Sequence, residues 1–306
     1  MGSSIIRRVV SAALRRFSPD LYQTLKIGQY ARTWVLPRPT TSQDSYLPSE
    51  MLGLNGIPMD LAAQLQRLGR WEGERYQTLF RRLREDAAIN KGVCGQAYGT
   101  EALHNGYYPT PDAEIYAAMI LDLKPSIIVE VGSGFSTLIA RHAIAFGNLK
   151  TRLTVIDPNP RTDVGPAADE IVRRTVEESD LEQREWPPGS LLFIDSTHIC
   201  RTRGDLPLLF CKVLPKLPVG TVVHAHDIFL PYDYPTKYDP LCYTEQYMLH
   251  CMLCGSARYR TLFATHHLSR AHPQAMQRVF GPRVGSDPLF NGGSYWLQVV
   301  PNEARP

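Results

Sequence analysis

The stretch that most constrains the fold is 126–137, which reads Ser-Ile-Ile-Val-Glu-Val-Gly-Ser-Gly-Phe-Ser-Thr. It follows Pro125, and its apolar, β-branched run passes directly into two glycines. This pattern predicts a buried parallel strand that ends in a tight turn. Apolar residues at helical spacing follow from Leu138 to Phe146. A strand, a glycine turn and a helix in this order form the first half of a nucleotide-binding βαβ unit, so we expect an α/β sheet built around it.

The turn itself has the pattern acidic-x-Gly-x-Gly, formed by Glu130, Gly132 and Gly134. A dinucleotide-binding fingerprint would place a third glycine where this chain has Thr137. A short Gly-x-Gly after a strand also occurs in plain turns that bind nothing. The spacing alone therefore leaves a cofactor turn and a structural turn both open.

A regular alternation of strands and helices follows the glycine turn. Helices are expected between the strands, including 206–214 and 273–280. The last strand alternates apolar and polar residues, which is typical of an antiparallel strand. With 127–131 as the first strand, the six others are predicted at 152–157, 173–178, 190–195, 221–227, 259–265 and 293–300.

The residues before this core predict an N-terminal helical cap over 1–103, followed by a catalytic domain over 104–306. Within the cap, 5–17 forms a basic amphipathic pattern, and 59–89 has helical spacing. The first of these favours packing on the protein's own core or on a second subunit over a membrane surface, which makes a homodimer through this region a hypothesis. An aromatic, proline-containing insertion at about 229–256 is interpreted as a lid.

Composition excludes several classes of function. A chain of 306 residues holds one α/β domain and an accessory segment, and its net charge of +3 is too small to indicate nucleic-acid binding. No apolar run approaches the roughly 20 residues of a membrane span. Six cysteines without framework spacing, and no signal peptide, predict reduced thiols in a cytoplasmic protein. Cys251 and Cys254 have CxxC spacing but are interpreted as buried helical residues.

Acidic residues stand at the predicted ends of four strands, where ligands bind in open α/β sheets. They are Glu130, Asp157, Asp195 and Asp227. Carboxylates gathered at one edge repel each other and lose solvation, so a ligand rich in hydroxyl and ammonium groups is indicated. Asp157, at the end of the second strand, is placed to accept hydrogen bonds from ribose hydroxyls.

The fourth and fifth strand ends also carry histidines, in Asp195-Ser-Thr-His198 and His224-Ala-His226-Asp227. In one interpretation, His226 or His198 is a general base oriented by Asp195 or Asp227. In the other, Asp195, His198, His226 and Asp227 bind a divalent metal such as Mg, Mn, Fe or Zn. His226 is nearer the open edge and is the first candidate for chemistry, while His224 is interpreted as a support.

Several motifs together resemble a bacterial group of class I S-adenosylmethionine-dependent methyltransferases, methyltransferase family 24. The resemblance covers roughly 104–300 and implies a Rossmann-like seven-stranded sheet, with the last strand antiparallel beside the sixth, and S-adenosylmethionine as cofactor. Catechol-type O-methyltransferases place metal ligands at the same two strand ends. The motifs are 130–137, 193–198, 224–235, 244–247 and 292–296. The cofactor-binding residues expected from them are Glu130, Gly132, Ser133, Gly134, Ser136, Asp157 and Asp195.

The acceptor pocket is expected to be small and partly apolar. We predict methyl transfer to an oxygen, or a nitrogen, of a small metabolite; the alternative is an iron-dependent oxidative or cyclising enzyme on the same fold that uses the His/Asp cluster. The residues expected to line or close the pocket are Tyr107, Tyr108, His224, Tyr232, Tyr234 and Glu245.

Overall fold

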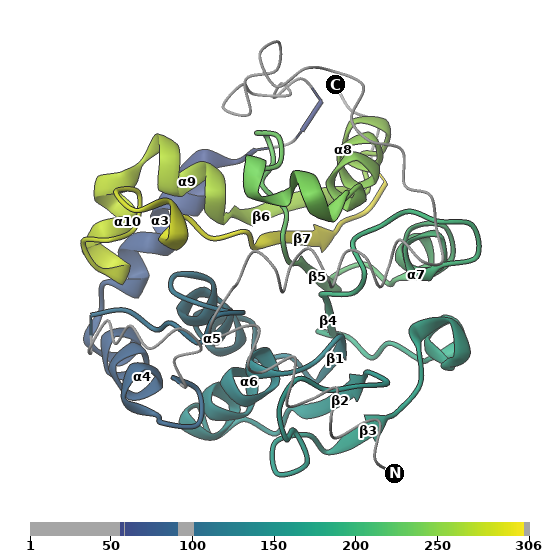
Figure 1. Cartoon of the computed structure of the whole chain (residues 1–306), viewed down its shortest axis with the longest axis horizontal. Helices are drawn as coiled ribbons and strands as arrows, with labels where there is room; N and C mark the ends of the chain where they lie inside the picture. The colour runs from purple at the N-terminus through teal and green to yellow at the C-terminus, as the bar shows by residue number, and fades with distance from the viewer. Residues whose placement is uncertain (1–55, 58, 91–100, 303–306) are drawn as a thin grey trace.

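The computed structural model describes residues 56–57, 59–90 and 101–302 (Figure 1). The predicted basic amphipathic helix at 5–17, and with it most of the hypothetical homodimer surface, lies outside the described residues. Among the residues that are described, no helix is both long enough and apolar enough to cross a membrane.

One seven-stranded sheet forms the centre of the molecule, in the order β3-β2-β1-β4-β5-β7-β6. Strands β1 to β5 pair in parallel, whereas β7 runs antiparallel to both of its neighbours. The predicted seven-stranded sheet, with an antiparallel last strand beside the sixth, is thereby confirmed. The strands are β1 (Ile127–Val131), β2 (Arg152–Ile156), β3 (Glu170–Val172), β4 (Leu191–Ile194), β5 (Val222–Ala225), β6 (Tyr259–Ala264) and β7 (Tyr295–Val299).

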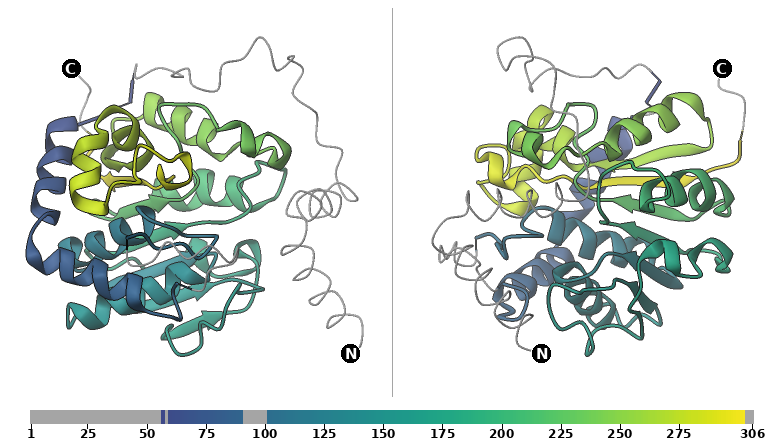
Figure 2. Two further views of the ribbon diagram at one scale, coloured as in Figure 1. Left: turned by 60° about the vertical axis from the view of Figure 1, so that its left-hand side comes forward. Right: turned by 45° about the vertical axis from the view of Figure 1, so that its right-hand side comes forward.

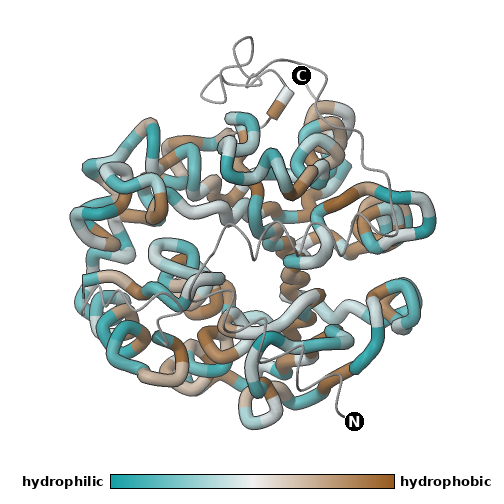
Figure 3. The backbone as a smooth tube through the Cα atoms, viewed as in Figure 1, coloured by the Kyte–Doolittle hydropathy of each residue, from teal (hydrophilic) through white to brown (hydrophobic). Residues whose placement is uncertain are grey.

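The central strands are apolar because helices cover both faces of the sheet. Figure 3 shows hydrophobic residues gathered along these strands. Ile128 and Phe193 pack on one face, while Val129 and Ile194 pack on the other. Parallel pairing of β1 with β2 and β4 brings three carboxyl ends to one edge of the sheet. Their polar residues therefore meet there.

Helices α4, α5 and α6 cover one face, and α7 and α8 cover the other (Figures 1 and 2). Helices α3 and α10 contact each other beside β6. The bounds are α3 (Leu61–Trp71), α4 (Glu74–Glu85), α5 (Asp112–Leu123), α6 (Phe135–Phe146), α7 (Asp205–Leu208), α8 (Glu245–Gly255), α9 (Thr265–Ala271) and α10 (Pro273–Phe280).

The described part of the N-terminal cap is packed firmly on the sheet. Trp71 is fully buried, with its ring centroid 5.2 Å from that of Phe263 on β6 and 6.2 Å from that of Phe280 on α10. The carboxylate of Asp122 on α5 accepts hydrogen bonds from Trp71 Nε1 at 3.3 Å and from Tyr76 Oη at 2.6 Å. Aromatic burial and this shared acceptor join α3 and α4 to the core.

The predicted third strand at 173–178 is wrong, because β3 comprises Glu170–Val172 and a 3₁₀ turn occupies Val176–Glu178. β3 is an edge strand with a weak apolar pattern. Its Glu170 is held by Thr154 Oγ1 at 3.0 Å and by ion pairs to Arg152 and Arg184. Polar contacts, rather than a hydrophobic run, fix this strand, which explains why the pattern missed it.

Two further expectations need correction. The predicted helix 206–214 is α-helical only over Asp205–Leu208 and continues as a wider π-type turn over Leu209–Val213 and a 3₁₀ turn over Leu214–Lys216. Cys251 and Cys254 lie on α8 as expected, but both are exposed rather than buried. The apolar residues Leu249 and Leu253 supply the buried face of that helix.

Candidate active site

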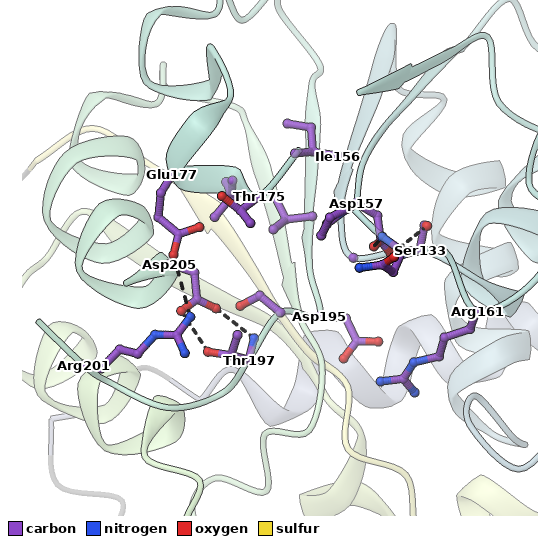
Figure 4. A pocket seen from close by; sticks show the side chains of 16 residues that line it. Ser133, Ile156, Asp157, Arg161, Thr175, Glu177, Asp195, Thr197, Arg201 and Asp205 are labelled. Carbon is purple, nitrogen blue, oxygen red and sulfur yellow. Dashed lines mark hydrogen bonds and ion pairs between the residues drawn. The ribbon is translucent and has the colours of Figure 1, made fainter. Parts of the chain in front are cut away.

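A first cavity of about 250 Å³ lies at the carboxyl ends of β1, β2 and β4 (Figure 4). Gly132 allows two walls of the cavity, the turn after β1 and the end of β4, to lie close together. The φ angle of Gly132 is +87°, and a Cβ at this position would lie 2.0 Å from the carbonyl oxygen of Asp195. Only glycine lets the turn after β1 approach the end of β4 in this way. The polar lining includes Ser133, Asp157, Arg161, Asp195, Ser196 and Thr197.

Asp157 connects the turn after β1 to the end of β2. Its carboxylate accepts hydrogen bonds from the backbone N–H and Oγ of Ser133, at 2.8 and 2.9 Å, and from the backbone N–H of Asn159 at 2.7 Å. These bonds hold the carboxylate at the cavity wall. A carboxylate has about four acceptor sites, so one remains for a hydroxyl group of a ligand.

Glu130 is fully buried and does not line the cavity. Its carboxyl accepts hydrogen bonds from Tyr116 Oη at 2.8 Å and from Thr137 Oγ1 at 2.5 Å. Burial raises the pKa of Glu130 to about 7, although these two hydrogen bonds oppose the rise. Gly134 and Ser136 also lie outside the cavity lining. Three of the expected cofactor residues therefore stand behind the wall of the cavity.

A second, larger cavity of about 790 Å³ lies at the end of β5. His226 and Asp227 follow β5 and form part of its wall, together with Asp112 at the start of α5. Other lining residues come from the segments after β5 and β6 and from the segment before β7, and include Phe229, Lys237, Tyr238, His266, Arg270 and Gly293.

His198 forms the centre of a buried polar cluster. Its Nδ1 lies 2.8 Å from Glu245 Oε2, and its Nε2 lies 3.1 Å from Asp195 Oδ1 and 3.8 Å from Asp227 Oδ2. Glu245 is fully buried, so it fixes the orientation of the ring from behind. Asp227 Oδ1 in turn accepts a hydrogen bond from Tyr238 Oη at 2.8 Å.

His226 lies between two carboxylates. Its Nε2 is 3.4 Å from Asp112 Oδ2, and its Nδ1 is 3.6 Å from Asp195 Oδ1. Asp112 is itself anchored, because it accepts hydrogen bonds from the backbone N–H groups of Gly293 and Ser294. Asp195 thus contacts both histidines and joins them into one cluster.

The carboxylates set the charge of both imidazoles. Burial lowers the pKa of His198, but Asp195, Glu245 and Asp227 outweigh burial and raise it to about 10. Burial also lowers the pKa of His226, and Asp227, Asp112 and Asp195 together raise it well above its usual value. Burial raises the pKa of Asp195, yet the two histidines hold it well below its usual range. In this arrangement the carboxylates favour the protonated form of both histidines.

His224 is fully buried and lines neither cavity. Its ring stacks on Trp296, with centroids 4.0 Å apart, and its Nε2 lies 3.4 Å from Tyr108 Oη. Tyr108 in turn packs against the His226 ring at 4.6 Å between centroids. Burial and the neighbouring charge of His226 hold the pKa of His224 well below its usual value, so it is neutral. This is the position of a supporting residue.

The expected pocket residues fall into different places. Tyr107 lines the second cavity, whereas Tyr232 and Tyr234 are buried beneath its wall. Tyr234 Oη accepts a hydrogen bond from the backbone N–H of Gln246 at 3.1 Å. Glu245 orients His198 instead of facing the cavity.

Sequence reasoning missed Asp112 and Arg161. An acid in the first turn of a helix is common because it complements the helix dipole, so Asp112 carried no separate signal. Arg161 lines the first cavity, and its guanidinium points toward Asp195 in Figure 4. Its place in the loop after β2 gave no indication of this orientation.

Three of the four predicted metal ligands form a compact donor set in the described part of the chain. One ligand atom each from Asp195, His198 and Asp227 lies within 4.8 Å of the others. His226 stands beside this set, 3.6 Å from Asp195. Two carboxylates and an imidazole backed by the Glu245 carboxylate suit a divalent cation, because a second carboxylate commonly orients a metal-binding histidine.

The family comparison covers the part of the chain that builds the first cavity and includes His226 and Asp227 of the second. Residues 129–228 match the methyltransferase family 24 model, which describes a methyltransferase domain. A protein of Archaeoglobus fulgidus, described as uncharacterized, is 43% identical over 58 residues, which make up 19% of this chain and 26% of that protein. The match thus spans about a quarter of that relative's length.

Two solved structures are also similar, at low sequence identity. An O-methyltransferase from Bacillus cereus in complex with SAH matches with a TM-score of 0.36 and 13% identity, over 62% of this chain and 81% of that chain. An SAH-bound methyltransferase from Podospora anserina matches with a TM-score of 0.39 and 12% identity, over 79% of this chain and 97% of that chain. Residues 129–228, about a third of the chain, are thus similar to a methyltransferase domain, and they contain strands β2 to β5 of the sheet.

Proposed function

We propose that this protein transfers a methyl group from S-adenosylmethionine to an oxygen of a small acceptor. The observation that carries the proposal is the position of Asp195, which lines the first cavity and contacts His226 in the wall of the second. A donor in one cavity and an acceptor in the other would meet beside this residue. Proximity and alignment supply most of the rate in a transfer of this kind.

The first cavity fits the cofactor. Asp157 keeps an acceptor site for a ribose hydroxyl, and Gly132 leaves room where a side chain would collide with Asp195. The buried Ser196 Oγ, which lines the cavity, has no hydrogen-bond partner in the described part of the protein. When bound, S-adenosylmethionine supplies a methyl group on a sulfonium, which an aligned oxygen nucleophile displaces.

The polar cluster is proposed to hold a divalent cation rather than a general base. Four carboxylates, from Asp112, Asp195, Asp227 and Glu245, surround two imidazoles. With both imidazoles protonated, the six groups carry four negative and two positive charges, so a net negative charge remains. A divalent cation would offset this charge, displace the proton from His198 Nε2, which must be unprotonated to act as a ligand, and lower the pKa of an acceptor hydroxyl. A protonated histidine, by contrast, takes no proton from the acceptor.

The segment 229–256 is proposed as the lid of the catalytic domain 104–306. Two of its residues contact the polar cluster: Tyr238 donates a hydrogen bond to Asp227, and Glu245 contacts the His198 ring. The position of the segment and the geometry of the cluster therefore depend on each other. Its aromatic residues would exclude water from the transfer. The methyltransferase domain favours this reaction over the oxidative or cyclising alternative.

The cofactor assignment is tested by calorimetric titration of the full chain with S-adenosylmethionine. Saturable binding is expected, and Asp157→Asn should weaken it by about tenfold or more, since an amide accepts fewer hydrogen bonds than a carboxylate. Asp163→Asn is the matched control, because this exposed acid follows the same strand but does not line the cavity. Absence of binding by the wild-type protein would refute the proposal.

The cation is tested by titrating the chelator-treated protein with Mg²⁺ or Mn²⁺. Binding is expected for the wild type and for Asp157→Asn, whose cluster is intact, and should be lost in Asp227→Asn. If Asp227→Asn bound the cation as well as the wild type, the cluster would not be the site.

A further inference from the structure

Two cations at the rim of the second cavity stand apart from the acidic cluster. Arg270 lies on α9 and Lys237 in the 3₁₀ turn Thr236–Leu241, and both side chains are exposed. The inner wall is formed by buried Asp112 and His226, of which 2% and 5% are exposed. The cavity therefore has a buried wall formed by an aspartate–histidine pair and a basic rim.

Aromatic rings, rather than carboxylates, hold these two cations. The guanidinium carbon of Arg270 lies 4.0 Å from the ring centroid of the buried Tyr232, and Lys237 Nζ lies 5.1 Å from that of Tyr238. Neither cation forms an ion pair within the described ranges, in contrast to the partly buried Arg84, which pairs with Glu114 at 2.8 Å. Stacking positions the charge and leaves the N–H groups available.

Two of the acids that line this cavity already have hydrogen-bond donors of their own. Asp233 lines the cavity, but its Oδ1 accepts hydrogen bonds from the backbone N–H of Tyr234, from Gln246 Nε2 and from Tyr247 Oη, at 2.7, 3.2 and 2.6 Å. Asp112 is held by two backbone N–H groups. The positive charge at the rim is thus left for a ligand.

The lining also contains aromatic residues and one neutral histidine. Phe229 and Tyr238 contribute rings with centroids 4.9 Å apart, and the His266 ring packs edge-on against Phe229 at 5.0 Å. His266 Nδ1 lies 3.1 Å from the carbonyl oxygen of Gly292 and donates to it, so its Nε2 is an acceptor. Burial lowers the pKa of His266 to about 4, and the ring is uncharged at neutral pH.

We propose that the methyl acceptor is a partly aromatic hydroxy compound that carries a carboxylate, and that Arg270 and Lys237 bind this carboxylate. The hydroxyl would face Asp227 and His226, the rings would cover the aromatic part, and the planar guanidinium would match the carboxylate. This inference rests on the proposed function for the hydroxyl end. The carboxylate end rests on the cavity alone.

The test compares acids with their neutral amides, which have nearly the same shape. Para-hydroxyphenylacetate and para-hydroxyphenylpropionate, with their corresponding amides, are titrated calorimetrically into the full chain with and without SAH. Each acid that binds should do so about tenfold or more tightly than its amide, because a charge-assisted hydrogen bond is lost in the amide. In Arg270→Gln, with or without Lys237→Gln, the acid should fall to the affinity of the amide while the amide is unchanged.

Arg278→Gln is the matched control, because this exposed arginine on α10 pairs with Glu72 and does not line the cavity. Equal binding of acid and amide by the wild type, a preference that survives both substitutions, or no binding of either acid would overturn the inference. Binding of SAH is recorded separately. Its absence would refute the proposed function, whereas SAH binding without an acid preference would refute only the carboxylate subsite.

Discussion

Replacing Glu130 with glutamine should stabilise the protein in a way that depends on pH. Glu130 is fully buried, and its pKa is about 7 in the folded chain against an ordinary value of 4.5. Because the folded pKa lies above the unfolded one, the folded state keeps a proton that the unfolded state has already lost. The free energy of unfolding therefore falls as the pH rises from about 4.5 to about 7, and the loss persists above that range.

The magnitude follows from the two pKa values. Between about pH 5.5 and about pH 8.5, the wild-type chain should lose about 2 kcal/mol of unfolding free energy through this one group. The glutamine side chain does not titrate in this range, so it contributes no such pH dependence. Its Oε1 can still accept from Tyr116 Oη, and its amide can donate to Thr137 Oγ1, so both native contacts have a counterpart. The stability of Glu130→Gln relative to the wild type should thus rise by the same amount over this range.

The assay is urea unfolding of both full-length proteins, followed by circular dichroism at several pH values. Glu114→Gln is the control, because Glu114 is equally buried but pairs with Arg84 at 2.8 Å. Removing that charge leaves Arg84 uncompensated and should destabilise the protein by about 3 kcal/mol. If the difference between Glu130→Gln and the wild type stayed constant with pH, the assignment of a raised pKa to Glu130 would be wrong.

Three other substitutions test the site and its support. Gly132→Ala should abolish binding of S-adenosylmethionine in calorimetry, because its Cβ would lie 2.0 Å from the carbonyl oxygen of Asp195; unchanged affinity would show that the turn can move. Glu245→Gln removes a carboxylate 2.8 Å from His198 Nδ1, so the pKa of that ring should fall below its value of about 10. Proton NMR titration of the chelator-treated protein measures it, and an unmoved titration contradicts the contact. Trp71→Ala removes a fully buried ring and should lower the free energy of unfolding by about 3–5 kcal/mol. Denaturant unfolding measures this loss, and a change below about 1 kcal/mol would contradict the prediction.

The central sheet was predictable because its strands are continuous apolar runs. β1, β2, β4 and β5 lie within the expected ranges, since burial on both faces selects residues such as Ile128 and Leu192. The same criterion failed for β3, whose Glu170 is fixed by side-chain contacts to arginines. Ile171 and Val172 are its only apolar residues, and a run of two is too short to indicate a strand.

The histidine and aspartate cluster was also predictable in outline. Parallel neighbours place Asp195 and Asp227 at the same sheet edge, and the structure brings both to His198. Asp112 and Arg270 were beyond reach of such reasoning, because they enter the cavities from α5 and α9. Both residues are far in sequence from the strand ends, and only the packing of those helices brings them to the cavity.

The shared position of Asp195 has a thermodynamic consequence. One carboxylate lines the first cavity and contacts the imidazoles of His198 and His226. A ligand that changes the charge or position of this carboxylate must alter affinity on the other side, and linkage makes the effect reciprocal. If a bound cation changes the affinity for the methyl donor by some factor, a bound donor must change the affinity for the cation by the same factor. The two occupants would then assemble as a coupled pair, and the order in which they arrive would not change the final free energy.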